Sequence, residues 1–357
     1  MPQYIEQDVA RALLDALNEV PKTHAELRMR IASIDPRVDL MIEASIGGQK
    51  RLLMVEMKQT AFPRDVREML YRLLQLGDSY DGRRILPMVI ANSLSAGARQ
   101  EIREAGAGYF DLSGSLYLPA DPAFVFIDRP PRKAQAKKLA TVFHGRKAAV
   151  VRVLFSRRDE WISVKEISDA AAVSPATASE TLTELERREW VEAQGAGPTK
   201  QRRLTSELAT VVLDAWTQDV VSRPPSRWRR YFVPAEAQQM VVMIGEAARD
   251  AGARYAITGE AAAQTYTPHL TSLSLVRCRM TLDAHGAEVL NRLGARAVGE
   301  GWNLAIHDSR NPSDFSDSRQ IDGVCYASPL QVYLDLLHAP GRAKDLGQFL
   351  RRDLLRA

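Results

Sequence analysis

The sequence has little of several residue types, and each shortage excludes a class of protein. It contains only two cysteines, Cys278 and Cys325. Two isolated cysteines provide neither a disulfide framework nor the paired spacing of a zinc site, and they are typical of a protein in a reducing compartment. We therefore expect a cytoplasmic protein that is not held together by disulfides.

Long hydrophobic runs are also missing. No apolar run approaches the ~20 residues that a membrane span requires, and the apolar fraction of 45% is ordinary for a globular protein. The first residues, "MPQYIEQDVARALL", contain acids and no basic stretch followed by an apolar block, so no secretion signal is expected. The sequence predicts no membrane partner.

Common catalytic motifs are absent as well. The segment "GAGPTK" (195–200) lacks the Gly-Lys-Ser/Thr ending of a phosphate-binding loop. The six histidines form no His-Glu-x-x-His, and no Gly-x-Ser-x-Gly occurs. These absences argue against P-loop nucleotide hydrolases, zinc proteases and serine hydrolases of the α/β type.

Positive charge is present, and it is concentrated in the middle of the chain. Residues 129–232 carry 20 Lys or Arg against 12 Asp or Glu, a net charge of +8. Residues 1–128 have a net charge of −3 and residues 233–357 a net charge of −1. A basic region between two slightly acidic ones indicates binding to a polyanion such as nucleic acid.

Two basic segments with Pro-Pro pairs, at 128–138 and 222–230, divide the chain of 357 residues. They predict three domains, at 1–128, 129–230 and 231–357. The expected fold class is α/β and α+β, multidomain. The first region predicts a mixed α/β domain with a hairpin turn at Gly47-Gly48; its helices are expected at 4–19, from 63 and at 95–105, and its strands at 37–46, 51–58, 84–91, 108–111 and 115–118.

The segment 163–205 is the most informative part of the sequence. Ser163 and Glu166 form a capping box that begins a helix, and Ser174 with Pro175 begins a second helix after a tight turn. On this second helix Ala178, Leu182 and Leu185 recur at helical spacing, which predicts a buried face. A strand, a Gly/Pro-rich tip and a basic strand follow, as in a winged helix-turn-helix, whose second helix enters the major groove of DNA.

This segment resembles the winged helices of bacterial regulators of the MarR type through Ser174, Thr177, Ser179, Leu182 and Leu185. The alternative is a helical domain that contacts proteins. In the DNA-binding interpretation the second helix reads the groove and Lys200, Arg202 and Arg203 of the wing contact phosphates. The candidate DNA-binding residues are Ser174, Ala176, Thr177, Ser179, Glu180, Thr183, Arg187, Lys200, Arg202 and Arg203.

The segment "SRPPSRWRRYF" (222–232) has two interpretations. Its arginines and aromatic residues are suited to gripping a nucleic-acid backbone while stacking on bases. The alternative is a linker whose aromatic residues anchor on the third region.

The first region contains two acids and a lysine in a nuclease-like arrangement. Asp39 lies near one predicted strand, and Glu56 and Lys58 lie two residues apart on the next, so that their side chains point the same way. This region resembles the PD-(D/E)XK, or restriction-endonuclease-like, fold. The resemblance implies Mg²⁺ held by Asp39 and Glu56, with Lys58 assisting hydrolysis and a further acid from the first helix. Candidates for that acid are Glu6, Glu19 and Glu26.

The third region contains "RYAITGEAAAQTY" (254–266) and then "SLSLVRCRMTL" (272–282), and it resembles the start of a nucleotidyltransferase-like domain. Such enzymes hold two metals with an acidic pair on the second strand. No Asp or Glu lies between Glu260 and Asp283. The resemblance therefore implies the fold without its catalytic acids.

Residues 140–357 as a whole resemble the AbiEi family, the antitoxins of type IV toxin–antitoxin systems, through "YAITGEAAA" and "SPLQVYLDLL". The resemblance implies a repressor of its own promoter that binds double-stranded DNA, as a homodimer or as a monomer on tandem half-sites, and that offsets a separately encoded nucleotidyltransferase toxin. DNA binding requires no cofactor. The alternatives are a Mg²⁺-dependent DNA endonuclease targeted by the winged helix and a protein-interaction scaffold.

Overall fold

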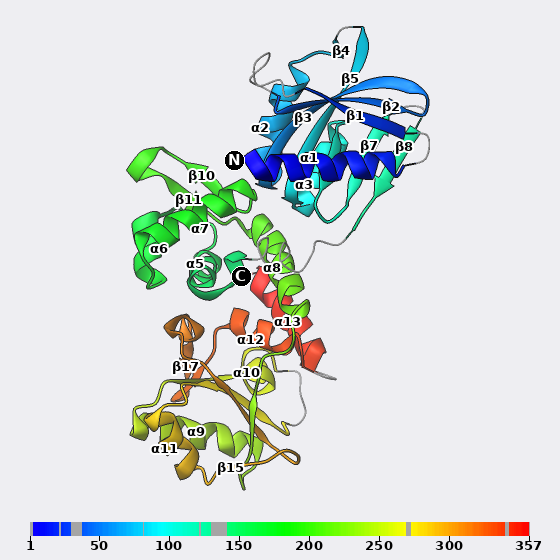
Figure 1. Ribbon diagram of the computed structural model, residues 1–357. Coiled ribbons are helices and arrows are strands. Elements are labelled where there is room, and N and C mark those ends of the chain that lie inside the picture. The colour runs from blue at the N-terminus through cyan, green and yellow to red at the C-terminus, as the bar shows by residue number, and fades with distance from the viewer. Residues whose placement is uncertain are drawn as a thin grey trace. The chain divides into compact units, whose positions relative to one another are not determined.

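The protein has a mixed α/β structure made of two compact units (Figure 1). The structure, a computed structural model, describes residues 3–20, 23–29, 38–80, 82–120, 123–129, 141–268, 273–339 and 343–356. The first unit comprises residues 1–141 and 183–189, and the second comprises residues 142–182 and 190–357. The expected boundary near 230 falls inside the second unit. Most of the basic segment 128–138 lies outside the described residues.

The first unit is built on one eight-stranded sheet with the strand order β1-β2-β3-β5-β6-β7-β8, in which β4 also pairs with β5. Strands β3, β5 and β6 run parallel to one another, and the other pairs are antiparallel. Its elements are α1 (Gln3–Asn18), β1 (Thr23–Met29), β2 (Leu40–Ile46), β3 (Gln49–Ala61), α2 (Pro63–Leu74), β4 (Ser79–Tyr80), β5 (Arg83–Leu94), α3 (Ala96–Glu104), β6 (Gly108–Asp111), β7 (Leu116–Ala120) and β8 (Ala123–Ile127).

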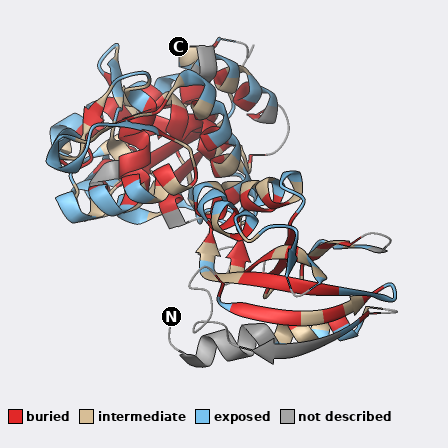
Figure 2. Ribbon diagram, turned by 90° about the horizontal axis from the view of Figure 1, so that it is seen from above, coloured by how far each residue is buried: buried red, intermediate tan, exposed pale blue. Residues whose placement is uncertain are grey.

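Alternation of side chains along the strands gives this sheet two apolar faces. One core cluster joins Leu13 and Leu17 of α1 to Ile42 and Val55. The other joins Met69 and other apolar residues of α2 and α3 to strand residues of opposite parity. Figure 2 shows that buried residues of this unit are concentrated in its strands. The sheet therefore lies between α1 on one face and α2 with α3 on the other.

The predicted order of elements in the first region is confirmed, and three strands were missed. The missed strands are β1, β4 and β8. Gly47 and Gly48 form the two-residue turn between β2 and β3, with φ values of 57° and 82°, because a tight hairpin turn needs left-handed backbone. Asp39 lies immediately before β2 rather than within it, and its N–H donates to Val55 O over 2.9 Å.

The second unit begins with a group of short helices and a small sheet. The three-stranded sheet has the order β10-β11-β9. The elements are η1 (Thr141–Phe143), α5 (Gly145–Ser156), β9 (Ile162–Ser163), α6 (Val164–Ala170), α7 (Pro175–Arg187), β10 (Glu192–Gln194), η2 (Gly197–Thr199), β11 (Gln201–Arg203) and α8 (Ser206–Val221).

The predicted helix starts in this group are confirmed. Glu166 N donates to Ser163 Oγ over 3.3 Å, and Ser163 N donates to Glu166 Oε2 over 2.8 Å, which is the capping box of α6. Thr177 N donates to Ser174 Oγ over 3.2 Å at the start of α7. Between the two helices Ala172 has a φ of 51°. The turn that separates α6 from α7 thus contains a left-handed residue, which prevents one continuous helix.

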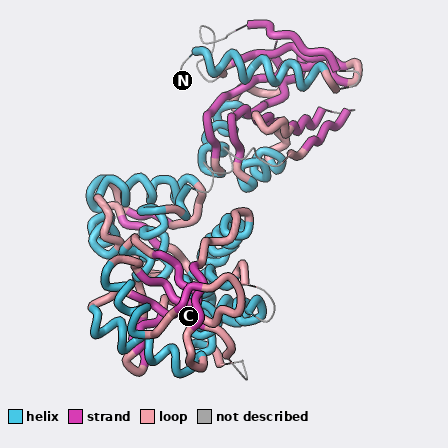
Figure 3. Tube along the Cα trace, turned by 60° about the horizontal axis from the view of Figure 1, so that its bottom comes forward, coloured by secondary structure: helices cyan, strands magenta, loops and turns pink. Residues whose placement is uncertain are grey.

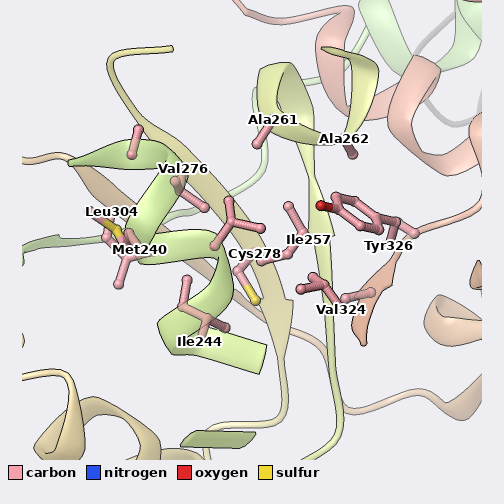
Figure 4. Packing of buried hydrophobic residues seen from close by; sticks show 14 of the residues in the cluster. Met240, Ile244, Ile257, Ala261, Ala262, Val276, Cys278, Leu304, Val324 and Tyr326 are labelled. Atoms are coloured by element: carbon pink, nitrogen blue, oxygen red, sulfur yellow. The ribbon is translucent and has the colours of Figure 1, made fainter. Parts of the chain in front are cut away.

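The rest of the second unit surrounds a seven-stranded mixed sheet, β15-β12-β16-β14-β13-β18-β17 (Figure 3). Figure 4 shows Met240 and Ile244 of α9 packed with Cys278 and Leu304 of the sheet. The elements are β12 (Arg229–Phe232), α9 (Ala237–Ala251), β13 (Tyr255–Thr258), α10 (Gly259–Tyr266), β14 (Val276–Met280), α11 (Ala284–Arg292), β15 (Arg296–Ala297), β16 (Leu304–Asp308), η3 (Pro312–Phe315), β17 (Arg319–Ile321), β18 (Val324–Tyr326), α12 (Pro329–Leu336) and α13 (Ala343–Arg356).

The segment 222–232 continues into this sheet. Arg229–Phe232 forms β12, which pairs with β15 and β16, and Tyr231 packs against the core of the second unit. For the aromatic residues of this segment, the linker interpretation agrees with the structure. Among the helices that the structure describes, none has both the length and the apolar character to cross a membrane.

Candidate functional site

Helix α7 has one buried face and one exposed polar face. Ala178, Leu182 and Leu185 are buried, with at most 1% of each residue exposed, as their helical spacing predicts. Thr181 is also buried, and its hydroxyl donates to Thr177 O over 2.7 Å. The structure brings most of the sequence-predicted residues of this helix together on the other face: Ser174, Ala176, Ser179, Glu180 and Thr183 are exposed, and Thr177 is half-buried.

Glu180 is the acid on this exposed face, and the structure gives it a counter-charge. Lys147 Nζ of α5 donates to Glu180 Oε1 over 2.8 Å. The side chain of Glu180 is 69% exposed and that of Lys147 is 22% exposed. The carboxylate therefore contributes little net negative charge to the surface around it. Sequence reasoning missed Lys147, whose position three residues into a helix carried no signal of this pairing.

The wing residues Lys200, Arg202 and Arg203 do not share one exposed surface. Arg202 is buried, with 5% of the residue exposed. Its position in the register opposite Ile162 of β9 explains this, because successive residues on a strand face opposite sides of the sheet. Only Lys200 and Arg203 are half-exposed, so the expectation that all three reach a phosphate backbone needs correction at Arg202.

Arg203 is held in place by its neighbours on the small sheet. Its Nε and Nη2 donate to Glu192 Oε2 over 3.0 and 2.5 Å, and its guanidinium lies 4.6 Å from the centre of the Trp161 ring. Its position is therefore fixed by a two-point ion pair and a cation–π contact. An anion that binds Arg203 would have to share it with Glu192.

Arg187, at the end of α7, is engaged within the first unit. Its Nη2 donates to Asp65 Oδ2 over 2.8 Å, and its guanidinium lies over the ring of Phe62. Burial acts to raise the pKa of Asp65, but hydrogen bonds from Arg187, the Phe62 amide and Lys58 outweigh it and lower that pKa. Arg187 is thus half-buried in an ion pair, unlike the exposed residues at the start of the helix.

The two acids of the first unit lie near each other. Met57 N donates to Asp39 Oδ2 over 2.6 Å, which fixes the Asp39 carboxylate beside β3. Burial raises the pKa of Glu56, and the negative charge of Asp39 adds to the rise, whereas Arg72 lowers it. A partly buried carboxylate next to the exposed carboxylate of Asp39 is an arrangement that attracts a cation.

The cation next to Glu56 and Asp39 is an arginine of the protein itself, Arg72. Arg72 of α2 forms an ion pair with Glu56 Oε1, and Glu56 together with the charge of Asp39 raises the pKa of Arg72. Lys58 does not point to the acids either, because its Nζ forms an ion pair with Asp65 Oδ1 over 2.9 Å. Both positive groups near the site are therefore used for internal pairing.

We tested whether these residues fit the Mg²⁺ that the resemblance implies. The second oxygen of Glu56, Oε2, is buried and has no hydrogen-bond partner among the described residues, which leaves one oxygen available. Mg²⁺ requires near-ideal octahedral oxygen coordination. In the part of the chain that the structure describes, no three His, Cys, Asp or Glu side chains gather into a metal site. With Arg72 on Glu56, the residues do not fit the ion.

The further acid proposed for the first helix is not supplied by Glu26. Glu26 lies on β1, and Glu19 lies just after the end of α1. The side chains of Glu6 and Glu26 lie outside the described residues.

In the second unit, β14 carries two buried arginines where the resemblance to nucleotidyltransferases leads one to look for acids. Arg277 and Arg279 are 9% and 7% exposed, and their spacing of two directs them to the same side of the strand. Arg277 pairs with Glu260 over 3.5 Å, and Arg279 Nη2 donates to Asp335 Oδ1 over 2.5 Å. The alternation in "VRCRM" was a signal in the sequence that was not used.

Asp335 of α12 is the centre of a buried polar network. Its two oxygens accept hydrogen bonds from Arg279, from Thr258 Oγ1 over 2.7 Å and from Gln331 Nε2 over 2.8 Å. Burial acts to raise the pKa of Asp335, but Arg279 outweighs it and lowers that pKa. Asp335 is thus a carboxylate held ionised inside the protein.

Comparisons of the chain with protein-family profiles, with curated proteins and with solved structures find no match.

Proposed function

We propose that this protein is a sequence-specific, double-stranded DNA-binding transcription regulator whose α6, α7 and β10–β11 hairpin form a winged helix-turn-helix. The observation that carries the proposal is the division of α7 into a buried apolar face and an exposed polar face that begins at a capped N-terminus. A recognition helix of this kind presents its N-terminal residues to base edges. The +8 net charge of residues 129–232 supports it.

In the same proposal, the first unit is a restriction-endonuclease-like domain that does not cut DNA, and residues 231–357 are a nucleotidyltransferase-like domain without catalytic acids. The strand order of the first sheet and the ion pair of Arg72 with Glu56 support the first part. The arginines on β14 support the second. The physiological role that we propose is the antitoxin of a type IV toxin–antitoxin system of the AbiEi kind, in the cytoplasm, repressing its own promoter as a dimer or on tandem half-sites and counteracting a nucleotidyltransferase toxin.

A charge-reversal experiment tests DNA binding by α7. Ser179→Glu and Thr183→Glu each add a negative charge to the exposed face without touching the core. Gln239→Glu adds the same charge to an exposed position of α9 and is the matched control. We expect each α7 variant to bind DNA from upstream of its own gene at least about tenfold more weakly, because discrimination at a base contact is about 1–3 kcal/mol. The measurement is a fluorescence-anisotropy titration.

The wing has a different expected signature. The double variant Lys200→Ala, Arg203→Ala should weaken binding to specific and random DNA alike, and it should reduce the slope of log affinity against log salt by about 1 for each phosphate that the wing no longer neutralises. Arg202 is left intact because it is buried. An unchanged salt slope would refute the role of the wing, and equal affinity of the Thr183→Glu and Gln239→Glu proteins would refute the role of α7.

A further inference from the structure

A cavity of about 260 Å³ lies inside the second unit, next to the Asp335 network. Its wall comes from α5 and α8, from the segment that precedes β12, and from β14, β16 and α12. Three of its residues are arginines and three are large aromatic residues: Arg152, Arg223 and Arg279, and Phe143, Trp216 and Trp228. This volume is slightly below the range of ~300–1,000 Å³ for drug-sized ligand pockets, so the occupant has to be small.

Arg152 is a buried cation in the wall of this cavity. The residue is 9% exposed. Its Nη2 donates to Gln331 Oε1 over 2.5 Å, and its guanidinium lies 5.2 Å from the centre of the Trp216 ring. Gln331 and Trp216 are neutral. Among the residues that the structure describes, no carboxylate forms an ion pair with Arg152, although buried charges in proteins are normally paired.

The two other arginines that line the cavity have carboxylate partners. Arg279 uses the carboxylate of Asp335, and Arg223 forms an ion pair with Asp219. Gln331 connects the two arginines of the network, because its amide donates to Asp335 while its oxygen accepts from Arg152. The four residues Arg152, Gln331, Asp335 and Arg279 therefore carry a net charge of +1.

The pKa shifts of Arg152 and His307 agree with a net positive charge beside the cavity. Burial and the charge of Arg279 lower the pKa of Arg152 to about 10. Burial and Arg279 also lower the pKa of His307, which lines the same cavity. Asp314 lines the cavity too, and its charge, like the charges of Asp335 and Asp317, acts to raise the pKa of Arg152 without outweighing burial.

We propose that this cavity binds a small organic phosphate monoester, with the phosphate on Arg152. A guanidinium offers several N–H donors in a plane, which match the oxygens of a phosphate. Ser226 also lines the cavity and adds a hydroxyl donor, while Arg279 keeps its N–H groups on Asp335 and Ser309. The carboxylate of Asp314 is suited to accept hydrogen bonds from the hydroxyls of an attached sugar, and Trp228 presents an apolar ring surface. The site is independent of DNA binding.

Isothermal titration calorimetry of the full chain tests the proposal with four probes: ribose 5-phosphate, glycerol 3-phosphate, inorganic phosphate and malonate. We expect both monoesters to bind more tightly than inorganic phosphate and malonate. Arg152→Met should weaken the binding of the monoesters at least about tenfold, because it removes charge-assisted hydrogen bonds. Arg152→Lys, which keeps the charge but not the planar fork, should fall between.

Arg292→Met is the matched control, since Arg292 lies on α11 in exposed pairs with Glu288 and Asp250. It should leave binding unchanged. Without ligand, Arg152→Met should unfold at the same temperature as the unmodified protein or a higher one, because the variant no longer buries an unpaired charge. The proposal is overturned if neither monoester binds, if malonate binds as tightly as the monoesters, or if Arg152→Met and Arg292→Met bind alike.

Discussion

Each unit contains a group of like charges that side chains of opposite charge neutralise: the group is acidic in the first unit and basic in the second. In the first unit a pair of acids, Asp39 and Glu56, is neutralised by Arg72. In the second unit two arginines on β14 are neutralised by acids, Arg279 by Asp335 and Arg277 by Glu260. In both places charged side chains of the protein itself neutralise the group.

The two pairs differ in burial. The side chains of Arg72 and Glu56 are 43% and 13% exposed, whereas those of Arg279 and Asp335 are 8% and 6% exposed. Water screens the first pair on one side, whereas the second pair is buried away from water. The comparison teaches that burial separates an ion pair whose loss leaves a buried charge from one that water partly screens.

The largest effect is expected at Asp335. Asp335→Asn leaves Arg279 charged and buried without a counter-ion, so the free energy of unfolding should fall by about 3–5 kcal/mol. Urea denaturation measures it. Asp250→Asn is the control, because Asp250 is 61% exposed in its pair with Arg292 and should change the free energy by only about 0–1 kcal/mol. Equal losses in the two variants would break the link between burial and stability.

This loss should also depend on pH. Because Arg279 holds the pKa of Asp335 below its ordinary value of 3.8, the carboxylate contributes stability above that value and loses the contribution as the pH falls through the lowered pKa. The difference between the Asp335→Asn protein and the unmodified protein should therefore stay constant from neutral pH down to about pH 4 and shrink only in stronger acid.

An intermediate effect is expected at Arg72. Arg72→Met leaves the partly buried Glu56 without its cation and should lower the free energy of unfolding by about 1–2 kcal/mol at neutral pH. Burial already raises the pKa of Glu56, so without Arg72 the carboxyl should protonate at a higher pH. The loss of stability should then be smaller at about pH 5 than at about pH 8. Urea denaturation at both pH values measures it.

A cleavage assay tests the same acid pair from the functional side. Supercoiled plasmid incubated with the protein and Mg²⁺ or Mn²⁺ should remain intact, because Arg72 and Asp65 occupy the groups that a nuclease needs. Plasmid cleavage that disappears in both Glu56→Ala and Lys58→Ala would show a working metal site and reverse the interpretation of the first unit.

Local patterns predicted most of the fold. The Gly47-Gly48 turn, the Pro63 start of α2 and the Ser163–Glu166 capping box of α6 lie where the sequence places them, because short-range sterics and hydrogen bonds determine these features. Strands β1, β4 and β8 were missed. β1 and β8 lie at the two edges of the first sheet, and the two-residue β4 pairs with β5 off the main order. A strand in such a position gains its structure from its neighbour rather than from a strong pattern of its own.

The candidate sites were less predictable than the fold because they depend on long-range contacts. Helical spacing alone divided α7 into its two faces. The burial of Arg202 follows from strand alternation and was overlooked. Arg152 and Gln331, by contrast, are separated by 179 positions, and no periodicity connects them. Tertiary packing decides which charged residues form an ion pair, and the pairing of Lys147 with Glu180 is another example.

The smallest effect on stability is expected for Lys147 and Glu180, an ion pair whose side chains are 22% and 69% exposed. Lys147→Ala should change the free energy of unfolding by only about 0–1 kcal/mol. In the proposed function, however, it leaves Glu180 as a free negative charge on the face that reads DNA, so binding should weaken by about three- to tenfold, an energy of about 1 kcal/mol for a single uncompensated charge in water. Glu180→Gln combined with Lys147→Ala should restore most of this affinity at low salt. Anisotropy titrations of the two single variants and the double variant form a complete cycle. If the effects of the two single variants on DNA affinity simply add, Lys147 acts on DNA directly rather than by neutralising Glu180. In that case exposure alone does not make an ion pair available to a partner.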